Sequence, residues 1–116
     1  MQTVPEGKIT VAPEVLLEII QQAALYTEGV VRMASVPPRV DRIFRRVISA
    51  EGIEVEVNEN SMTVDLYLVV RAVDLRTLSH QVQREVIRAM DRLVGIAVTA
   101  VNIHVEDVEY PENGSA

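Results

Sequence analysis

The chain has 116 residues and a formal net charge of −6, and 48% of its residues are hydrophobic but only 3% are aromatic. This length predicts one domain with a single aliphatic core, and the scarcity of aromatic rings argues against stacking platforms for bases or sugars. Because the chain has no Cys, disulfides, thiolate zinc sites and cysteine nucleophiles are excluded.

The first half of the chain predicts a strand and two helices. Residues 7–11 are expected to form a short strand, followed by a helix over residues 13–27 in which apolar residues recur at helical spacing. Gly29 ends this helix, and residues 30–36 are expected to be an extended connector or strand. Pro38 then starts a basic amphipathic helix of about a dozen residues. The apolar stripe of this second helix is Val40, Ile43, Phe44 and Val47. This stripe either closes the core or meets a partner or membrane surface.

The second half predicts a β-hairpin, a long helix and a final strand. Apolar and polar residues alternate through residues 53–57 and 62–70, on either side of a turn. Asp74 is expected to cap a helix that ends at Leu93. The core stripe of that helix is Leu75, Leu78, Val82, Val86, Met90 and Leu93. The alternation returns at residues 101–105, ahead of a polar tail at residues 111–116 that is expected to be disordered.

Alternation this regular implies that the sheet has one solvated face, so the helices should lie together on the other face. The sequence therefore predicts a single α+β domain over residues 1–110. We expect two layers, with a mainly antiparallel or mixed sheet of three to four strands and helices packed on one face.

Four strings occur in a characteristic order: GKITVAPEVLLEIIQQAALYTEGVVRMAS, MTVDLYLVV, HQVQREV and GIAVTAVNIHVEDVEY. Together they resemble the alkaline shock protein twenty-three family, also called the Gls-type envelope stress response family. The resemblance implies a small, non-enzymatic, self-associating bacterial scaffold of the cytoplasm, recruited to the membrane by an anchor protein.

Short members are often encoded beside a kinase related to the dihydroxyacetone and fatty-acid kinases. The alternative role is therefore an accessory or regulatory partner of such a kinase in lipid metabolism. The family has no agreed catalytic residues to carry over. This chain departs from many relatives before the long helix, where it has Ala72 and Val73 in place of a Tyr-Gly pair.

Charged residues are distributed unevenly along the chain. Residues 32–46 hold five Arg and one Asp, whereas residues 51–65 hold five carboxylates and no base. On the long helix Arg76, His80, Arg84, Arg88 and Arg92 recur every fourth residue and form a basic ridge. Such patterns are either ordinary solvated faces or opposite patches through which copies of the chain contact one another. The candidate interaction residues are Arg39, Arg42, Arg45, Arg46, Arg84, Arg88, Arg92, Glu54 and Glu56.

The chain has few residues of the kinds that catalyse reactions or bind metal ions. His80 and His104 are expected to be plain surface residues, because they lack metal-ligand spacing. The carboxylates Glu54, Glu56 and Asp65 could face one another across the hairpin, and His104 and Glu106 could join them. A solvated face is the favoured interpretation of that group. We therefore predict no enzyme, cofactor, metal or small-molecule substrate.

Two further expectations concern partners and location. A nucleic-acid-binding module that uses the Arg residues between 39 and 46 and the basic ridge of the long helix is the second hypothesis. The acidic total, the near absence of aromatic residues and the lack of a recognised motif disfavour it. No apolar run approaches the length of a membrane span, and the first eight residues, MQTVPEGK, lack a signal-peptide core. The expected location is the cytoplasm, with contact to the membrane surface made through a partner.

Overall fold

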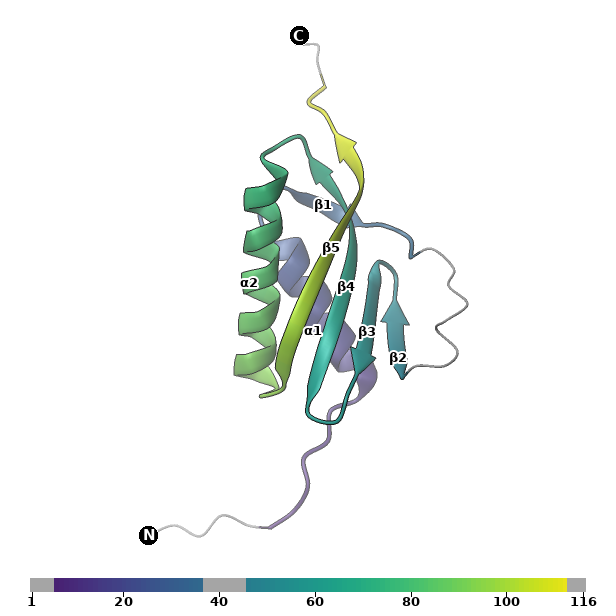
Figure 1. Cartoon of the computed structure of the whole chain (residues 1–116), viewed down its shortest axis with the longest axis vertical. Helices are drawn as coiled ribbons and strands as arrows, with labels where there is room; N and C mark the ends of the chain where they lie inside the picture. Colours follow the sequence, from purple (N-terminus) through teal and green to yellow (C-terminus); the bar gives the residue numbers. More distant parts are fainter. Residues whose placement is uncertain (1–5, 37–45, 113–116) are drawn as a thin grey trace.

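The computed structural model describes residues 6–36 and 46–112, in which two helices and five strands follow one another along the chain. They are α1 (Pro13–Tyr26), β1 (Val30–Met33), β2 (Val47–Ala50), β3 (Ile53–Val57), β4 (Ser61–Arg71), α2 (Leu75–Leu93) and β5 (Ala97–Glu109) (Figure 1). The first helix, the hairpin, the long helix and the final strand thus confirm the sequence-based predictions.

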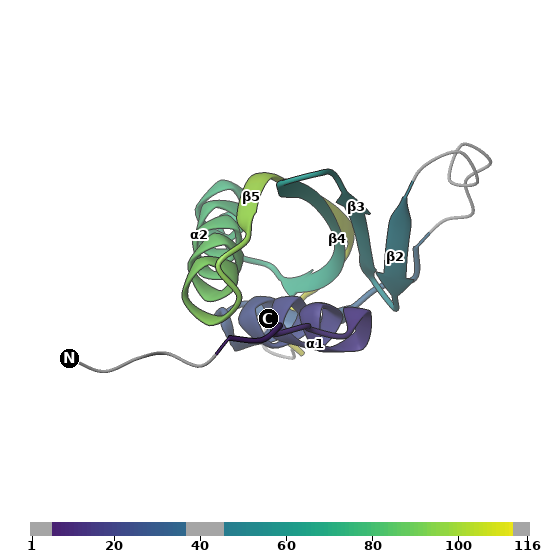
Figure 2. The same ribbon diagram turned by 90° about the horizontal axis from the view of Figure 1, so that it is seen from below.

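The strand β4 organises the sheet. Along one edge it pairs in parallel with β5, and along the other it pairs antiparallel with β3 and then with β1. The fourth partner, β2, lies beyond β3 and pairs with it antiparallel. Both helices pack on one face of this curved mixed sheet (Figure 2). The predicted α+β class with helices on a single face is therefore confirmed, with five strands where three to four were expected.

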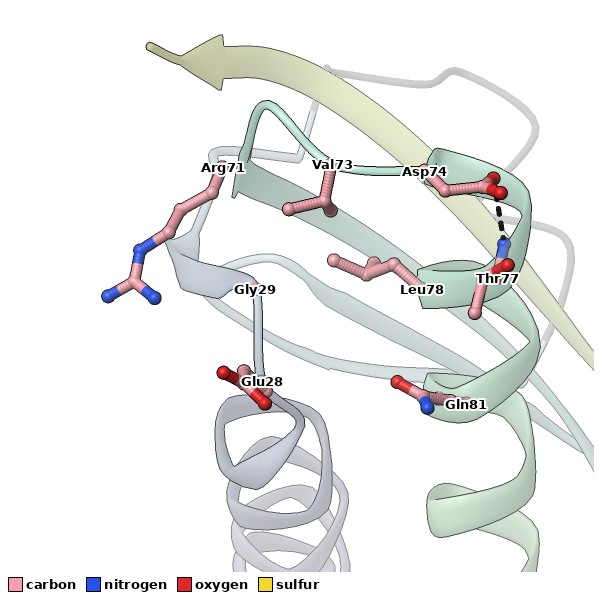
Figure 3. Close-up of a pocket in the computed structure, with 8 residues that line it drawn as sticks. All are labelled: Glu28, Gly29, Arg71, Val73, Asp74, Thr77, Leu78 and Gln81. Carbon is pink, nitrogen blue, oxygen red and sulfur yellow. Dashed lines mark hydrogen bonds between the residues drawn. The ribbon is translucent and has the colours of Figure 1, made fainter. Parts of the chain in front are cut away.

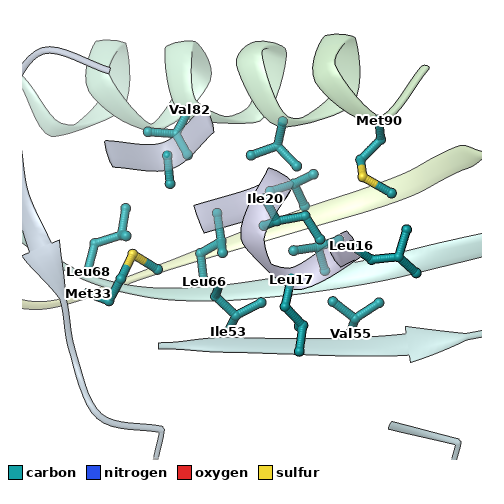
Figure 4. Packing of buried hydrophobic residues seen from close by; sticks show 14 of the residues in the cluster. Leu16, Leu17, Ile20, Met33, Ile53, Val55, Leu66, Leu68, Val82 and Met90 are labelled. Atoms are coloured by element: carbon teal, nitrogen blue, oxygen red, sulfur yellow. The ribbon is translucent and has the colours of Figure 1, made fainter. Parts of the chain in front are cut away.

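The core lies between the two helices and the sheet, and it is aliphatic as predicted (Figure 4). Ile20 on α1, Val82 on α2 and Leu66 on β4 are completely buried. Each points into the same layer because helical spacing on one side and strand alternation on the other select one apolar face per element. Among the residues described, no helix is long and apolar enough to cross a membrane.

Three local expectations are wrong. Residues 7–11 form no strand and are exposed, because they run away from the sheet ahead of α1 and lie beside none of its edges (Figure 1). Val47 begins β2 and does not extend a helix, because the β-branched pair Val47 and Ile48 pairs with β3. The rest of the expected second helix lies outside the described residues. Leu75 and Leu93 are 36% and 64% exposed, because they lie at the two ends of α2, beyond its buried stripe.

The turn between β2 and β3 depends on a glycine. Gly52 has a φ of +75°, and a Cβ built there would lie 2.6 Å from the Cβ of Met33 and 2.8 Å from the carbonyl oxygen of Ala34. Both the backbone angle and the close approach therefore select glycine.

We predict that Gly52→Ala lowers the free energy of unfolding by about 2–4 kcal/mol, measured by chemical denaturation. Gly95→Ala is the matched control, because Gly95 has a φ of +79° but no atom within 4 Å of the added Cβ. That control isolates the backbone cost of about 1–2 kcal/mol. Equal losses in the two variants would show that the close approach at Gly52 is unimportant.

Candidate functional site

A basic ridge runs along the solvent side of α2. All five residues of the ridge predicted from the sequence are exposed. The name basic ridge is kept for its C-terminal part, Arg84, Arg88 and Arg92, which recur at every fourth position. The Nη1 atom of Arg88 lies 3.3 Å from Oε2 of Glu85, and the arginine side chain is 58% exposed. An exposed pair of this kind contributes little to stability, and two of the three arginines lie outside it. The ridge therefore presents net positive charge to solvent.

The exposed acidic residues of the hairpin lie away from that ridge. Figures 1 and 2 both place α2 and the β2–β3 hairpin on opposite sides of the domain. Glu51, in the turn after β2, and Glu59, in the turn after β3, are exposed. Glu54 is only 4% exposed, so the expectation that it lies on a solvated face is wrong, and Glu56 is half-buried. Within the hairpin, the exposed negative charge is therefore carried by the turns.

The other predicted interaction residues fall near β2 or outside the described ranges. Arg46 is exposed immediately before β2, and its carbonyl oxygen accepts a hydrogen bond of 2.9 Å from the amide of Val57. Arg39, Arg42 and Arg45 lie outside the described residues. The structure thus gives positions for the basic ridge and for Arg46, and it separates the ridge from the hairpin.

An apolar groove lies between α1 and α2, which run in opposite directions (Figure 1). It has a volume of about 430 Å³ and is lined by Val15, Glu18, Ile19, Gln22, Ala23, Tyr26, Glu85, Arg88, Ala89, Arg92 and Leu93. Tyr26 is 87% exposed and Leu93 is 64% exposed. Two members of the basic ridge thus stand beside an exposed apolar surface, which is the composition of an interaction site.

The sequence contained a signal for this groove in the width of the apolar stripe of α1. The apolar stripe of α1 is wide, and its buried residues are Leu16, Leu17, Ile20 and Ala24. The neighbouring column of Val15, Ile19 and Ala23 lines the groove. Ile19 and Ala23 are half-buried against the core, whereas Val15 is 44% exposed, so this column is only partly covered within the molecule.

A second cavity, of about 270 Å³, lies where α2 begins (Figure 3). The carboxylate of Asp74 caps α2 by accepting hydrogen bonds from the amides of Thr77 (3.3 Å) and Arg76 (3.1 Å). The hydrogen bond from the Thr77 amide, with those from the Thr77 side chain and the Arg76 amide, lowers the pKa of Asp74 below its ordinary value. The helix N-terminus is thus already occupied by an anionic side chain, so this cavity does not favour a second anion.

The outer face of the sheet holds an acid–histidine contact. Nε2 of His104 lies 2.9 Å from Oδ1 of Asp65, and its ring stacks on Tyr67 with centroids 4.5 Å apart. The expectation that His104 is a plain surface residue is therefore wrong, whereas His80 is exposed as predicted. Across the hairpin Glu54 lies opposite Asp65, but Glu56 lies opposite Thr63.

Glu106 does not join this contact through strand pairing. Val105 and Asp107 pair with consecutive residues of β4, so Glu106 is the extra residue of a β-bulge. Within residues 6–36 and 46–112, no cluster of three or more His, Asp or Glu side chains could hold a metal ion. The stack and the hydrogen bond fix His104 on the sheet, which is a structural role.

Comparison with known proteins places these features in a family. The sequence model of the alkaline shock protein 23 (ASP23) family, described as having a cell envelope-related function, matches residues 1–110. The protein YloU of Bacillus subtilis is 28% identical over 106 residues, which cover 88% of this chain and 88% of YloU. The protein YqhY of the same organism is 26% identical over 106 residues, covering 90% of this chain and 78% of YqhY.

Solved structures give a weaker likeness. A MamM CTD variant is 16% identical with a TM-score of 0.49, and the match covers 83% of this chain and 98% of that one. A copper form of a MamM CTD variant is 14% identical with a TM-score of 0.48 and covers 83% of this chain and 98% of that one. A likeness of this strength carries no argument about metal binding or assembly in this chain.

Proposed function

This chain belongs to the alkaline shock protein 23 family, whose function is related to the cell envelope, and on that premise we propose that it serves there as a self-associating scaffold. The family is not a known enzyme family. The role we propose is non-enzymatic: copies bind one another and present a repeated surface to other envelope proteins. In this proposal the assembly lies on the cytoplasmic side of the membrane and is held there by a partner protein.

The observation that carries the proposal is the separation of charge across the domain. The basic ridge lies on α2, whereas the exposed Glu51 and Glu59 lie in the turns at either end of β3. Surfaces of opposite sign on one molecule favour contact with a second copy. Because the two surfaces differ, the contact is heterologous and generates rings or open filaments.

The apolar groove supplies binding affinity that exposed charges alone do not. Exposed ion pairs contribute about 0.2–1 kcal/mol each, so a few of them do not hold an assembly together. The groove adds apolar area directly beside Arg88 and Arg92. Charge then orients the approaching copy, and burial of the groove supplies most of the affinity.

The test of this proposal is the mass of the full chain by light scattering over a series of salt concentrations. We expect masses above the 12.9 kDa of one chain at low salt, falling as salt rises. The screening length shrinks from about 30 Å at 0.01 M salt to about 3 Å at 1 M, which weakens attraction between the exposed charges. A single 12.9 kDa species at low salt and high protein concentration would rule out self-association.

A further inference from the structure

The segment before α1 has the sequence pattern of a β-strand but pairs with no strand of the sheet. Residues 7–12, which we call the arm, alternate apolar and polar side chains around Ile9 and Val11. In the structure the arm is extended and exposed, and it leaves the domain at the N-terminal end of α1 (Figure 1). Ile9 is 95% exposed, the largest value among the exposed large apolar residues of the described chain. An apolar strand pattern held in solvent indicates a surface that a partner covers.

The arm points away from the rest of its own molecule, and its sequence favours that extended course. Ala12 has φ −65° and ψ 145°, and because it precedes Pro13 it strongly disfavours the helical conformation. Residues 8–12, KITVA, contain none of the Gly, Pro, Asn or Asp residues that form tight turns. Three of these five are β-branched, which favours an extended chain. The arm therefore continues away from α1 and does not reverse along it.

The groove between α1 and α2 has the dimensions and chemistry to receive such an arm. Six extended residues span about 20 Å, whereas the lining residues run from Val15 to Tyr26 on α1, about 17 Å, and from Glu85 to Leu93 on α2, about 12 Å, so the groove can hold most of the arm. The floor is apolar and suits Ile9 and Val11. The rim carries Glu18 and Glu85, one on each wall, together with Arg88 and Arg92, so it offers acidic partners for Lys8 beside basic side chains. The groove thus suits the apolar side chains and the charge of the arm, which does not lie in it within one molecule.

We infer that the arm of one copy lies in the groove between α1 and α2 of a second copy. This inference rests on the proposed self-association and names the contact that produces it. The arm leaves the domain at the same end as the turn after β3 that carries Glu59 (Figure 1). One approach therefore brings the arm into the groove and an acidic turn towards the basic ridge of the same neighbour. Because arm and groove are different surfaces, this contact is also heterologous, and the product is a ring or an open chain of copies.

Substitutions in the arm test this contact without risk to the fold, because the arm is exposed. Ile9→Asp and Val11→Asp should each weaken self-association by about tenfold or more, since each removes an apolar side chain from a buried contact. Thr10→Asp is the matched control: it adds the same charge to the same segment but on the opposite side of the strand. We expect Thr10→Asp to stay within about twofold of the parent, because an exposed charge changes little.

If the parent assembles and all three variants assemble equally well, the arm is not the contact, although self-association stands. If the parent is monomeric at high protein concentration and low salt, both the proposed function and this inference fail. Unchanged thermal melting of the variants confirms that any loss is one of association.

Cross-linking identifies the acceptor surface and the copy that provides it. The chain has no cysteine, so single cysteines can be introduced freely. Chains carrying Val11→Cys and chains carrying Ala89→Cys are mixed and treated with a short thiol-reactive cross-linker. We expect cross-linked pairs that contain one chain of each kind. Ser49→Cys, on the exposed edge strand β2, is the control acceptor. Preferential cross-linking to Ser49→Cys would place the arm on the sheet edge and overturn the groove assignment, as would a failure to cross-link to either position.

Discussion

Replacing Leu66 with Asp should abolish cooperative thermal unfolding. Leu66 is completely buried at the middle of β4, where the sheet faces both helices. An aspartate there leaves either a buried charge or a neutral carboxyl without hydrogen-bond partners, and it also removes the packing of the leucine. The combined loss of more than about 4 kcal/mol is comparable with the whole stability of a small domain. Val82→Asp should have the same effect from the opposite layer, because Val82 is also completely buried.

The matched control for Val82→Asp is Ile87→Asp. Ile87 lies on the same helix and is also β-branched, but it is 42% exposed. We expect that variant to melt cooperatively at a modestly lower temperature. Scanning calorimetry with circular dichroism decides the matter. If Leu66→Asp and Val82→Asp both melt like the parent, the core described here is not what stabilises the domain.

The second large effect is on assembly. Changing Arg84 and Arg92 together to Glu should reduce the chain to a monomer at low salt, because it turns attraction between the ridge and the acidic turns into repulsion. We expect the association constant to fall by a factor of about 100 or more, since each reversal replaces a favourable contact by an unfavourable one. Light scattering at fixed protein concentration measures the change.

The control for that reversal keeps the same net charge. Arg32 and Arg71 are both exposed and lie off α2, so changing them together to Glu alters the total equally but leaves the ridge intact. If the control disperses the assembly as well as the ridge variant does, general charge repulsion and not the ridge is responsible.

Much of the fold followed from local pattern. Alternation placed β3, β4 and β5, and helical spacing with Asp74 as the cap placed α2. These predictions succeeded because each element buries one face, so its apolar residues recur with the period of a helix or a strand. The family was also predictable, because the strings that resemble it lie within the residues that the family model matches.

What failed depended on contacts between distant segments. The pattern of residues 7–11 is that of a strand, but pairing requires that a segment lie beside a sheet edge, and this one runs away from the sheet ahead of α1. The burial of Glu54 and the stack of His104 on Tyr67 follow from strand order, which alternation does not specify. The groove was hidden because the second apolar column of α1 has the same spacing as the core column.

The most direct test of the central claim is complementation between oppositely altered chains. One variant carries Glu in place of Arg84 and Arg92, and the other carries Lys in place of Glu51 and Glu59. Each variant alone should be a 12.9 kDa monomer at low salt, because each then presents charge of one sign on both contact surfaces. Mixed in equal amounts, they should form a 25.8 kDa pair or larger species containing both chains, since the reversed ridge of one meets the reversed turns of the other. A mixture that remains monomeric, or single variants that assemble as the parent does, would contradict the claim that copies meet through these opposite surfaces.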